Sequence, residues 1–594
     1  MLVLSDNPFG YSLEAMKQCP QCRRVYDDET LKFCLDDGTS LLYGPGSNDP
    51  ATALLNVPPS SEDVTRRHIT NQTEETLTVT PKRKPIIFAA IAILAVAVSF
   101  VAYRSLSTNS ISGNLLHNAA GEPPIHSLAV LPLKPLDAGD NYVGMGIADA
   151  IIRRISQTGQ LIVRPTSAVR RYLNDDTDAL TAAKQLETDA VLEGSVQRSD
   201  DRLRVNVNLL RTTDGVSLWN ESFDLKMTDI FSIQDSVSQQ VAARLSLKLD
   251  APQQAGLKKR YTSNPIAYEY YQKAIYAFDQ RLEENKEKAL ATVELFKKAI
   301  DADPGYALAH AQLAYAYAEL ATFSDPTDPQ WAKLSSEETD RAQQLDPQLA
   351  EIHLTRSLIA WSAYGGFQTK TAIRELHQAQ ELNPNIGHAE LAALYGHAGL
   401  TELAKTELNK ATEIDPTSDF VKGQWLTFYW LSGQYDDWLV ENHRQYGPDI
   451  TFPENSVWYL LGKRRIDEAE QRLSKIKQEQ GPNAQLGSGE AILSALRGNF
   501  EAAERAIPGI LKERPVQNPN YHHATFDIAC VYALEGKSEE AVKWLQKTAD
   551  SGYPDYPRFE RDPYFDRIRQ APEFIQFMTA MKAEWESYKL EFSQ

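Results

Sequence analysis

Three cysteines near the N-terminus have a spacing that can hold a metal ion. Cys19 and Cys22 form a C-x-x-C turn, in which two thiolates can point at one ion, and Cys34 supplies a third sulfur. A second C-x-x-C pair would complete a tetrahedral zinc site, but Asp37 stands where its last cysteine would be. A carboxylate oxygen also binds zinc. The pattern therefore predicts one structural zinc ion held by Cys19, Cys22, Cys34 and Asp37, and the departure at Asp37 leaves the fourth ligand open.

These residues belong to a short module, residues 16–43, that resembles the zinc ribbons found at the start of many bacterial membrane proteins. The turn "CPQC" and the closing "FCLDDG" carry the resemblance. A fold this short has too little core to be stable without a metal or a similar cross-link, and the alternative is a ribbon that has lost its metal. Acidic and basic residues nearly balance across the module, so we expect it to contact protein and not phosphates.

Acidic residues further along the chain offer a weaker hint of chemistry. Asp137, Asp140 and Asp149 could form a carboxylate pair, but no His, Cys or Ser accompanies them at the spacing of a nucleophile or a metal site. We interpret them as solvated loop acids and predict a non-enzymatic protein. The formal net charge of −19 also argues against a general nucleic-acid binder.

An uncharged apolar run separates the cysteine module from the rest of the chain. Residues 86–103 would span ~27 Å as a helix, close to the thickness of a bilayer core. We predict a transmembrane helix over residues 85–104; a fully buried helix of a large domain is the alternative. Lys82, Arg83 and Lys84 precede the run and Arg104 alone follows it, so the positive-inside rule places the N-terminus in the cytoplasm.

This reading predicts a single-pass protein of the bacterial inner (cytoplasmic) membrane, with the C-terminal bulk in the periplasm. Two polar segments without hydrophobic periodicity are predicted to be linkers, residues 44–81 and 105–124. Beyond the membrane helix the chain holds only Cys530, so no disulfide is expected there.

Residues 125–250 show the pattern of an α/β domain. Apolar strands are predicted over 127–133, 160–164, 190–197, 203–211 and 216–225, and the Asp-Gly at 214–215 marks a hairpin. Helical spacing of isoleucines begins at Gly144, and two further helices are predicted over 179–187 and 229–247.

The order of these elements resembles the N-terminal domain of TolB and the related FlgO-like domain. The matching stretches are "SLAVLPL", "GMGIADAIIRRIS", "VLEGSVQR" and "DGVSLWNESFD". The resemblance implies a non-catalytic interaction module of the kind that follows a single membrane helix in CadC-like regulators and in some adenylate cyclases.

Residues 262–590 are predicted to form an all-α solenoid. Asp-Pro or Asn-Pro pairs at 303–304, 346–347, 383–384 and 415–416 recur near the 34-residue period of tetratricopeptide repeats, and we expect each pair to start the next helix. Residues 385–416 resemble the tetratricopeptide pattern well. We expect about eight helix pairs and a C-terminal cap, and no Lys, Asn or Arg cluster for a peptide carboxylate stands out. The predicted groove positions are Leu308, Ala311, Tyr315 and Ala318, and Ile386, Ala389, Ala393 and Gly396.

The predicted function is therefore a membrane-anchored adaptor that is not an enzyme. Its repeat groove would bind proteins or peptides, and the ribbon would pass a signal to a cytoplasmic partner. The aromatic residues of the middle repeats are expected to pack between helices, with a ligand-binding aromatic surface as the alternative. A CadC-like transmembrane transcriptional regulator is the second hypothesis for function, although residues 16–81 are too short and too acidic for a winged-helix DNA-binding domain. The sequence predicts no oligomeric state.

Overall fold

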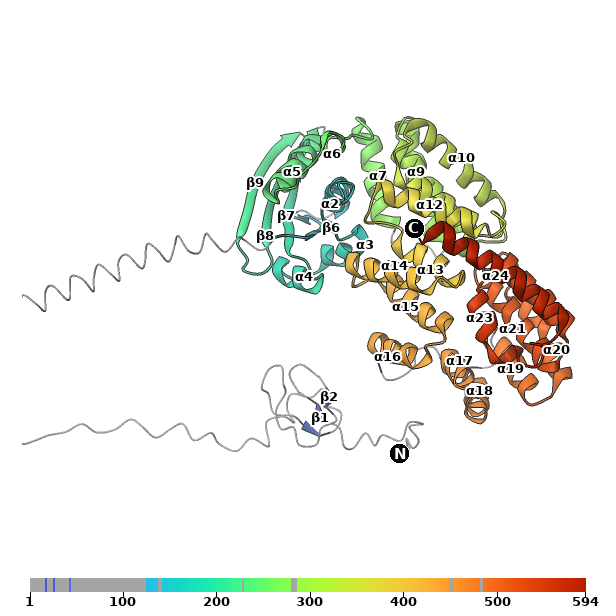
Figure 1. The fold of residues 1–594 in the computed structure, drawn as a ribbon. Coiled ribbons are helices and arrows are strands. Elements are labelled where there is room, and N and C mark those ends of the chain that lie inside the picture. The colour runs from blue at the N-terminus through green and yellow to red at the C-terminus, as the bar shows by residue number, and fades with distance from the viewer. Residues whose placement is uncertain are drawn as a thin grey trace, which may run out of the picture. The chain divides into compact units, whose positions relative to one another are not determined.

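The computed structural model describes residues 17–18, 25–26, 42–43, 124–136, 141–226, 229–278, 286–447, 453–480 and 484–593. The chain divides into two compact units, Met1–Ala120 and Gly121–Gln594 (Figure 1). In the first unit, β1 (Lys17–Gln18) pairs antiparallel with both β2 (Val25–Tyr26) and β3 (Leu42–Tyr43), which gives a small sheet of order β2-β1-β3.

The described helices correct two predictions made from the sequence. None of them is long and apolar enough to cross a membrane. The longest, α24 (Pro572–Phe592), carries charged residues along its length and buries only one side. The predicted fold class, which included a transmembrane helix, and the predicted inner-membrane localisation are therefore wrong on this finding. The segment that motivated both, residues 85–104, lies outside the described residues.

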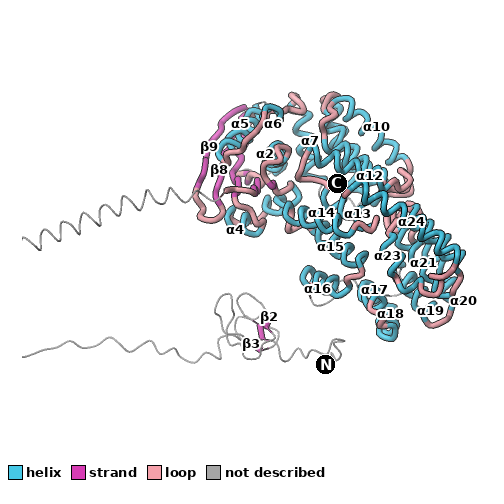
Figure 2. Tube along the Cα trace, in the orientation of Figure 1, coloured by secondary structure: helices cyan, strands magenta, loops and turns pink. Residues whose placement is uncertain are grey.

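The second unit begins with a mixed sheet of order β6-β4-β7-β8-β9, with β5 also paired to β7. β4 pairs parallel with β6 and β7, whereas β7, β8 and β9 form an antiparallel meander. The predicted strands and helices are thus confirmed, although β4 and β6 are shorter than expected. The long strands β8 and β9 are seen side by side in Figure 2. The bounds are β4 (Ser127–Val130), β5 (Lys134–Pro135), α2 (Asn141–Ser156), β6 (Ile162–Val163), α3 (Thr166–Val169), η2 (Arg170–Asn174), α4 (Ala179–Gln185), β7 (Ala190–Ser199), β8 (Arg202–Arg211), β9 (Ser217–Lys226), α5 (Ile230–Arg244) and α6 (Ala251–Gly256).

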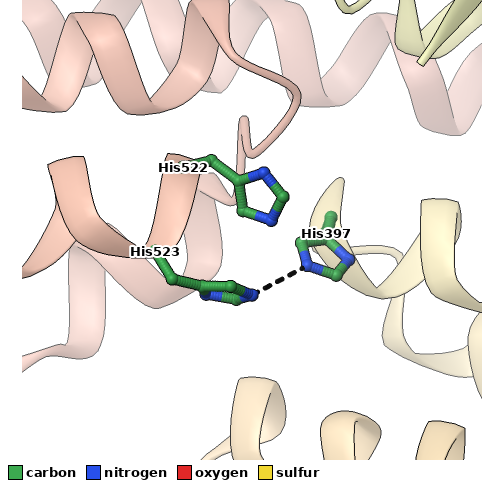
Figure 3. A group of neighbouring side chains, drawn as sticks. All are labelled: His397, His522 and His523. Carbon is green, nitrogen blue, oxygen red and sulfur yellow. Dashed lines mark hydrogen bonds between the residues drawn. The ribbon is translucent and has the colours of Figure 1, made fainter. Parts of the chain in front are cut away.

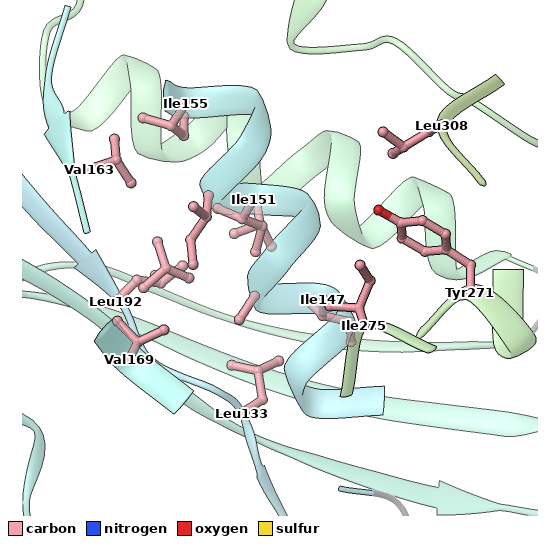
Figure 4. Close-up of a cluster of buried hydrophobic side chains, with 14 of the residues drawn as sticks. Leu133, Ile147, Ile151, Ile155, Val163, Val169, Leu192, Tyr271, Ile275 and Leu308 are labelled. Atoms are coloured by element: carbon pink, nitrogen blue, oxygen red, sulfur yellow. The ribbon is translucent and has the colours of Figure 1, made fainter. Parts of the chain in front are cut away.

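Helix α2 is the centre of this domain. Its isoleucines, Ile147, Ile151 and Ile155, are fully buried against the sheet, next to Leu192 (Figure 4). Gly144 lets the helix approach the strands, because a Cβ there would overlap the carbonyl oxygen of Leu133. The apolar core does not end at the domain boundary: the same buried cluster continues into helices of the repeats.

The repeats form eight antiparallel helix pairs in the part of the chain that the structure describes, as the sequence predicts. Helix α9 is extended by the π-helical turn η5 (Leu320–Ser324). The pairs are α7 (Pro265–Phe278) with α8 (Lys286–Ala302), α9 (Ala307–Glu319) with α10 (Gln330–Leu345), α11 (Ala350–Ala360) with α12 (Thr369–Leu382), α13 (His388–His397) with α14 (Thr401–Ile414), α15 (Asp419–Ser432) with α16 (Tyr435–Tyr446), α17 (Pro453–Gly462) with α18 (Ile466–Gln480), α19 (Ala484–Leu496) with α20 (Phe500–Glu513), and α21 (Tyr521–Glu535) with α22 (Ser538–Asp550).

The Asp-Pro and Asn-Pro pairs do not start helices, contrary to expectation. Asp346, Asn383 and Asp415 are the C-caps of α10, α12 and α14. The side chain of each accepts a hydrogen bond from the backbone N–H two residues on, at 3.1 to 3.2 Å, which makes an Asx turn. The following proline prevents the helix from continuing. The motif therefore ends one repeat and turns the chain toward the next.

The chain ends in a segment that folds back on the repeats. It comprises α23 (Tyr556–Arg561), the short η6 (Pro563–Phe565) and α24. The end of α24 lies near α12 and α13, far back in the sequence (Figure 1). The predicted cap is thus more than a lid on the last repeat, because it also packs against repeats in the middle of the solenoid.

Candidate functional site

The predicted zinc ligands lie outside the described residues. This holds for Cys19, Cys22, Cys34 and Asp37. The strands next to them are described: Gln18, just before Cys19, pairs with Val25 on β2. The antiparallel pairing of β1 and β2 therefore brings together the two residues that flank the six-residue stretch containing the C-x-x-C motif.

Asp149 is not the solvated loop acid that the sequence suggested. It lies on α2, is buried, and accepts a hydrogen bond from the Thr166 hydroxyl at 2.9 Å. It also faces Arg153 at 3.6 Å. Asp137 and Asp140 lie outside the described residues. Asp149 is therefore a buried acid with two structural partners, Thr166 and Arg153.

Arg153 is part of a contact between the α/β domain and the repeats that we call the charged seam. Arg153 forms an ion pair with Glu351 at the start of α11, and its guanidinium donates to the Tyr271 hydroxyl on α7 at 3.3 Å. Its neighbour Arg154 lies 2.9 Å from Asp235 on α5. Both arginine side chains are largely buried, so their charges are stabilised by these partners and not by water.

The charged seam runs along the loops that join one repeat to the next. The Ser156 hydroxyl donates to Asn383 at 2.8 Å, and the Asn385 amide donates to the backbone carbonyls of Ser156 and Leu161, each at 3.2 Å. Asn385 also accepts from the backbone N–H of Val163 at 3.3 Å. A loop of the repeats thus continues the hydrogen bonding of α2 and β6.

Arg164 extends the charged seam to the fourth helix pair. Its guanidinium donates to the carbonyls of Leu186 and Glu187 in its own domain, both at 2.7 Å. It also donates to Glu413 and Ile414 at the end of α14, at 2.6 and 3.1 Å. Burial lowers the pKa of Arg164, which stays far above neutrality. One planar, five-donor side chain therefore ties four carbonyls from two domains together.

A second contact, which we call the aromatic seam, joins residues 551–592 to the middle repeats. The indole N–H of Trp361 donates to the carbonyl of Gly552 at 3.2 Å, and that of Trp585 donates to Gly399 at 3.1 Å. The Phe592 ring stacks on His377, with centroids 6.1 Å apart. Large rings that each use one polar atom make up this contact.

Most of the predicted groove positions are buried. Leu308, Ala311, Ala318 and Ala389, predicted as groove positions, are all buried, and Leu308 lies in the core shared with the α/β domain (Figure 4). Gly396 is buried as well, whereas Tyr315, Ile386 and Ala393 are partly exposed. Five of the eight predicted groove positions are therefore buried in the folded chain, and Leu308 and Ala311 are buried in the core shared with the α/β domain.

The aromatic residues of the middle repeats mostly pack between helices, as expected. Trp438 is buried and stacks on Tyr459 at 6.2 Å, and the Trp425 indole donates to the Thr412 hydroxyl at 2.9 Å. The other predicted aromatics are partly buried against neighbouring cores. These are Trp361, Tyr429, Trp430 and Trp458.

Three histidines meet inside the aromatic seam. His397 ends α13, whereas His522 and His523 lie in the first turn of α21, and their imidazole rings face one another (Figure 3). One ring nitrogen from each lies within 4.8 Å of the others, and Nε2 of His397 is 3.4 Å from Nε2 of His523. Trp361 and Tyr553 flank the rings. Three imidazole nitrogens at this range could bind one metal ion.

The surroundings keep these histidines neutral. Burial lowers the pKa of His397 to about 4, and it lowers the pKa of His522 and His523 well below the ordinary value. The neighbouring rings add to the effect on His522 and His523. Neutral imidazoles have a free lone pair near pH 7, which is the form that binds metals.

Sequence reasoning missed this cluster. His522 and His523 are visible as an adjacent pair, but His397 is 126 residues away from His523. No zinc motif has such a spacing, and only the return of α21 onto α13 brings the three together.

Comparison with known proteins gives a partial match. Residues 125–242 match the model of the HilA/YgeH-like transcriptional regulator, second domain. This match covers the α/β domain, for which the sequence suggested a TolB N-terminal-like domain. The chain is 31% identical over 204 residues to putative adenylate cyclase 3 of Rhizobium meliloti (strain 1021), which is 33% of this chain and 34% of that protein. The chain thus spans about a third of that relative.

Two solved repeat structures are similar at low sequence identity. A tetratricopeptide repeat protein from Parabacteroides merdae ATCC 43184 is 15% identical, with 48% of this chain and 98% of that chain covered, at a TM-score of 0.29. Yeast Tom70 is 15% identical, with 61% and 80% covered, also at 0.29. Scores this low add nothing, so we base the description of a tetratricopeptide-like solenoid on the helix pairs themselves.

Proposed function

We propose that this chain is a non-enzymatic protein-binding scaffold in which the α/β domain and the repeats act as one body. The observation that carries the proposal is the continuous core: buried residues of α2 and the sheet share one cluster with Tyr271, Phe296 and Leu308 of the repeats. Domains joined by a large apolar core do not move independently. A rigid surface built from both domains is suited to holding a protein partner.

The partner surface that we propose is the α15–α16 pair. Phe420, Val440 and Tyr446 are three of the nine large apolar side chains that are well exposed among the described residues, with exposed fractions of 48, 68 and 38%. The Gln445 amide donates to the carbonyl of Lys422 at 3.0 Å, which places the Tyr446 end of α16 beside the Phe420 end of α15. Large apolar side chains gathered on one exposed helix pair are typical of a binding surface.

A capture experiment with the full chain tests this surface. We expect immobilised protein to retain a reproducible partner, and the double substitution Phe420→Glu with Val440→Glu to abolish retention. The matched control is Leu136→Glu with Val216→Glu, which adds the same charge at exposed apolar positions of the α/β domain. Equal retention by both variants would place the binding surface elsewhere. Absence of any reproducible partner would contradict the scaffold itself.

A second candidate function is transcriptional regulation, which the family match of residues 125–242 favours. The resemblance of this domain to TolB and FlgO supports an interaction role in either case. Because the chain carries a net charge of −19, we expect no direct DNA binding. A gel-shift titration at physiological salt separates the two candidates: a sequence-specific complex with DNA would favour the regulator over the scaffold.

We also propose that Cys19, Cys22 and Cys34 hold a structural zinc ion, with Asp37 as the fourth ligand. The support is the motif itself together with the pairing of β1 and β2 on either side of it. Cobalt substitution should give a sulfur-to-metal charge-transfer band that Cys34→Ser weakens. Tight binding that survives Cys34→Ser would refute the site, whereas unchanged binding in Asp37→Ala would remove only the fourth ligand.

A further inference from the structure

We propose that His397, His522 and His523 bind one zinc ion and so cross-link the fourth helix pair to the eighth. Their nitrogens come from two helices, α13 and α21, and converge within 4.8 Å. Zinc binds imidazole nitrogen at about 2.0–2.1 Å in tetrahedral sites. Nitrogen ligands of one ion are then a little over 3 Å apart, so small side-chain rotations would close the observed separation. This inference does not depend on the proposed function.

The hydrogen bonding of His397 prepares its Nε2 for a metal. Its Nδ1 lies 2.8 Å from the carbonyl oxygen of Ala393. A carbonyl only accepts, so Nδ1 carries the hydrogen, and Nε2 presents a lone pair toward His523. A backbone carbonyl that receives the second ring N–H is the usual outer partner of a metal-bound histidine.

His522 supplies a second, independent observation. It is 3% exposed, and neither of its ring nitrogens forms a hydrogen bond of regular geometry, although the backbone of Ser551 lies close enough to act on its pKa. A buried polar side chain without a partner costs free energy, so its presence calls for an explanation. A metal ion at the centre of the three rings would satisfy one of these nitrogens.

The environment suits zinc in other respects. His523 is only partly buried, so an ion could enter from its side. Three protein ligands leave a fourth position for water. Imidazoles alone also accept copper, nickel and cobalt. We commit to zinc because zinc tolerates a tetrahedral set of nitrogens.

The test uses the full chain with Cys19, Cys22 and Cys34 replaced by serine, which removes the thiolate site. We expect this protein to bind one equivalent of cobalt with ligand-field bands and no sulfur charge-transfer band, and zinc to displace it. His397→Gln and His523→Gln should each weaken binding at least tenfold. His377→Gln is the matched control, because His377 is a partly buried histidine outside the cluster, bonded to the Tyr395 hydroxyl at 2.8 Å.

Two outcomes would overturn the proposal: no metal bound by the serine-substituted chain, or equal binding by the His397, His523 and His377 variants. Should a histidine variant fail to fold, X-ray absorption of the zinc-loaded serine-substituted chain decides. Three imidazoles in the first coordination shell support the site, and fewer than two refute it. Failure of this site leaves the α15–α16 capture experiment untouched, since the two share no residue.

Discussion

The two seams hold the same solenoid by different chemistry. In the charged seam, buried arginines of the α/β domain bind a carboxylate and carbonyls at the ends of the repeat helices. In the aromatic seam, residues 551–592 pack rings against the middle repeats and use few polar atoms. The first contact depends on each donor meeting its acceptor, whereas the second depends mainly on filled volume.

The two seams should therefore respond differently when a side chain is truncated. A truncated ring leaves a cavity whose cost rises with its size. A truncated arginine leaves a buried carboxylate without its partner, which costs more than the pair contributed. Repeat four takes part in both seams, because the end of α14 meets Arg164 and the end of α13 carries His397.

The largest effect is expected for Phe559→Ala in the aromatic seam. Phe559 is fully buried and stacks on Phe526, with centroids 5.9 Å apart. We expect the free energy of unfolding to fall by about 3–5 kcal/mol. Urea denaturation followed by tryptophan fluorescence measures this loss. Ile575→Ala, at a half-exposed position of α24, is the control and should change stability by less than about 0.5 kcal/mol. A similar fall in the free energy of unfolding in both variants would mean that packing of the Phe559 ring does not stabilise the fold.

The next effect is expected for Arg153→Ala in the charged seam. The free energy of unfolding should fall by about 3 kcal/mol, because Glu351 and Asp149 would remain buried without their cation. The same denaturation measurement applies. The double variant Arg153→Met with Glu351→Leu tests the cause, since an apolar pair of similar volume should recover most of the loss. No recovery in the double variant would show that the seam needs the charges themselves.

A smaller effect is expected for Gly552→Ala, which tests how tightly the aromatic seam is packed. Gly552 has φ +94°, and a Cβ there would collide with the Trp361 indole. Gly498 has φ +78° with nothing nearby, so Gly498→Ala reports backbone strain alone. We expect Gly552→Ala to cost about 1–3 kcal/mol more than Gly498→Ala in thermal or urea unfolding. Equal costs would mean that Trp361 moves aside freely.

Local periodicity predicted much of this fold, because it depends on neighbours in the chain. The isoleucine spacing of α2 and the Asp-Gly turn between β8 and β9 both appear as expected. The Asp-Pro pairs were assigned to the wrong end of a helix, because Asp suits both an N-cap and an Asx turn and the sequence does not say which.

The seams and the histidine cluster could not be predicted in the same way. Ser156 and Asn383 are 227 residues apart, and Arg164 and Ile414 are 250 apart. Such contacts leave no periodic signal in a single sequence. They depend on how the helix pairs curve, which is set by many small packing choices along the solenoid. Only the folded chain shows that most of the predicted groove positions are buried.

The last prediction concerns Glu407 in repeat four, the repeat that both seams share. Its carboxylate accepts from Nδ1 of His388 at 2.6 Å and from Lys410 at 2.9 Å. Burial alone would raise its pKa, but these hydrogen bonds outweigh burial and lower the pKa to about 2. Because the folded pKa lies below that of the unfolded chain, about 4.3, the stabilisation is complete above that value and is lost as the pH falls toward 2.

We therefore expect Glu407→Gln to cost about 1–2 kcal/mol at pH 7, after allowing for partial exposure to solvent. The difference in the free energy of unfolding between this variant and the parent protein should become smaller as the pH falls below about 4.3. Urea midpoints at neutral pH and at several acidic pH values measure it. Glu402→Gln, at an exposed position of the same helix, is the control and should leave the pH profile unchanged. A stability difference between Glu407→Gln and the parent protein that stays constant into acid would show that the charge of the carboxylate does not stabilise repeat four.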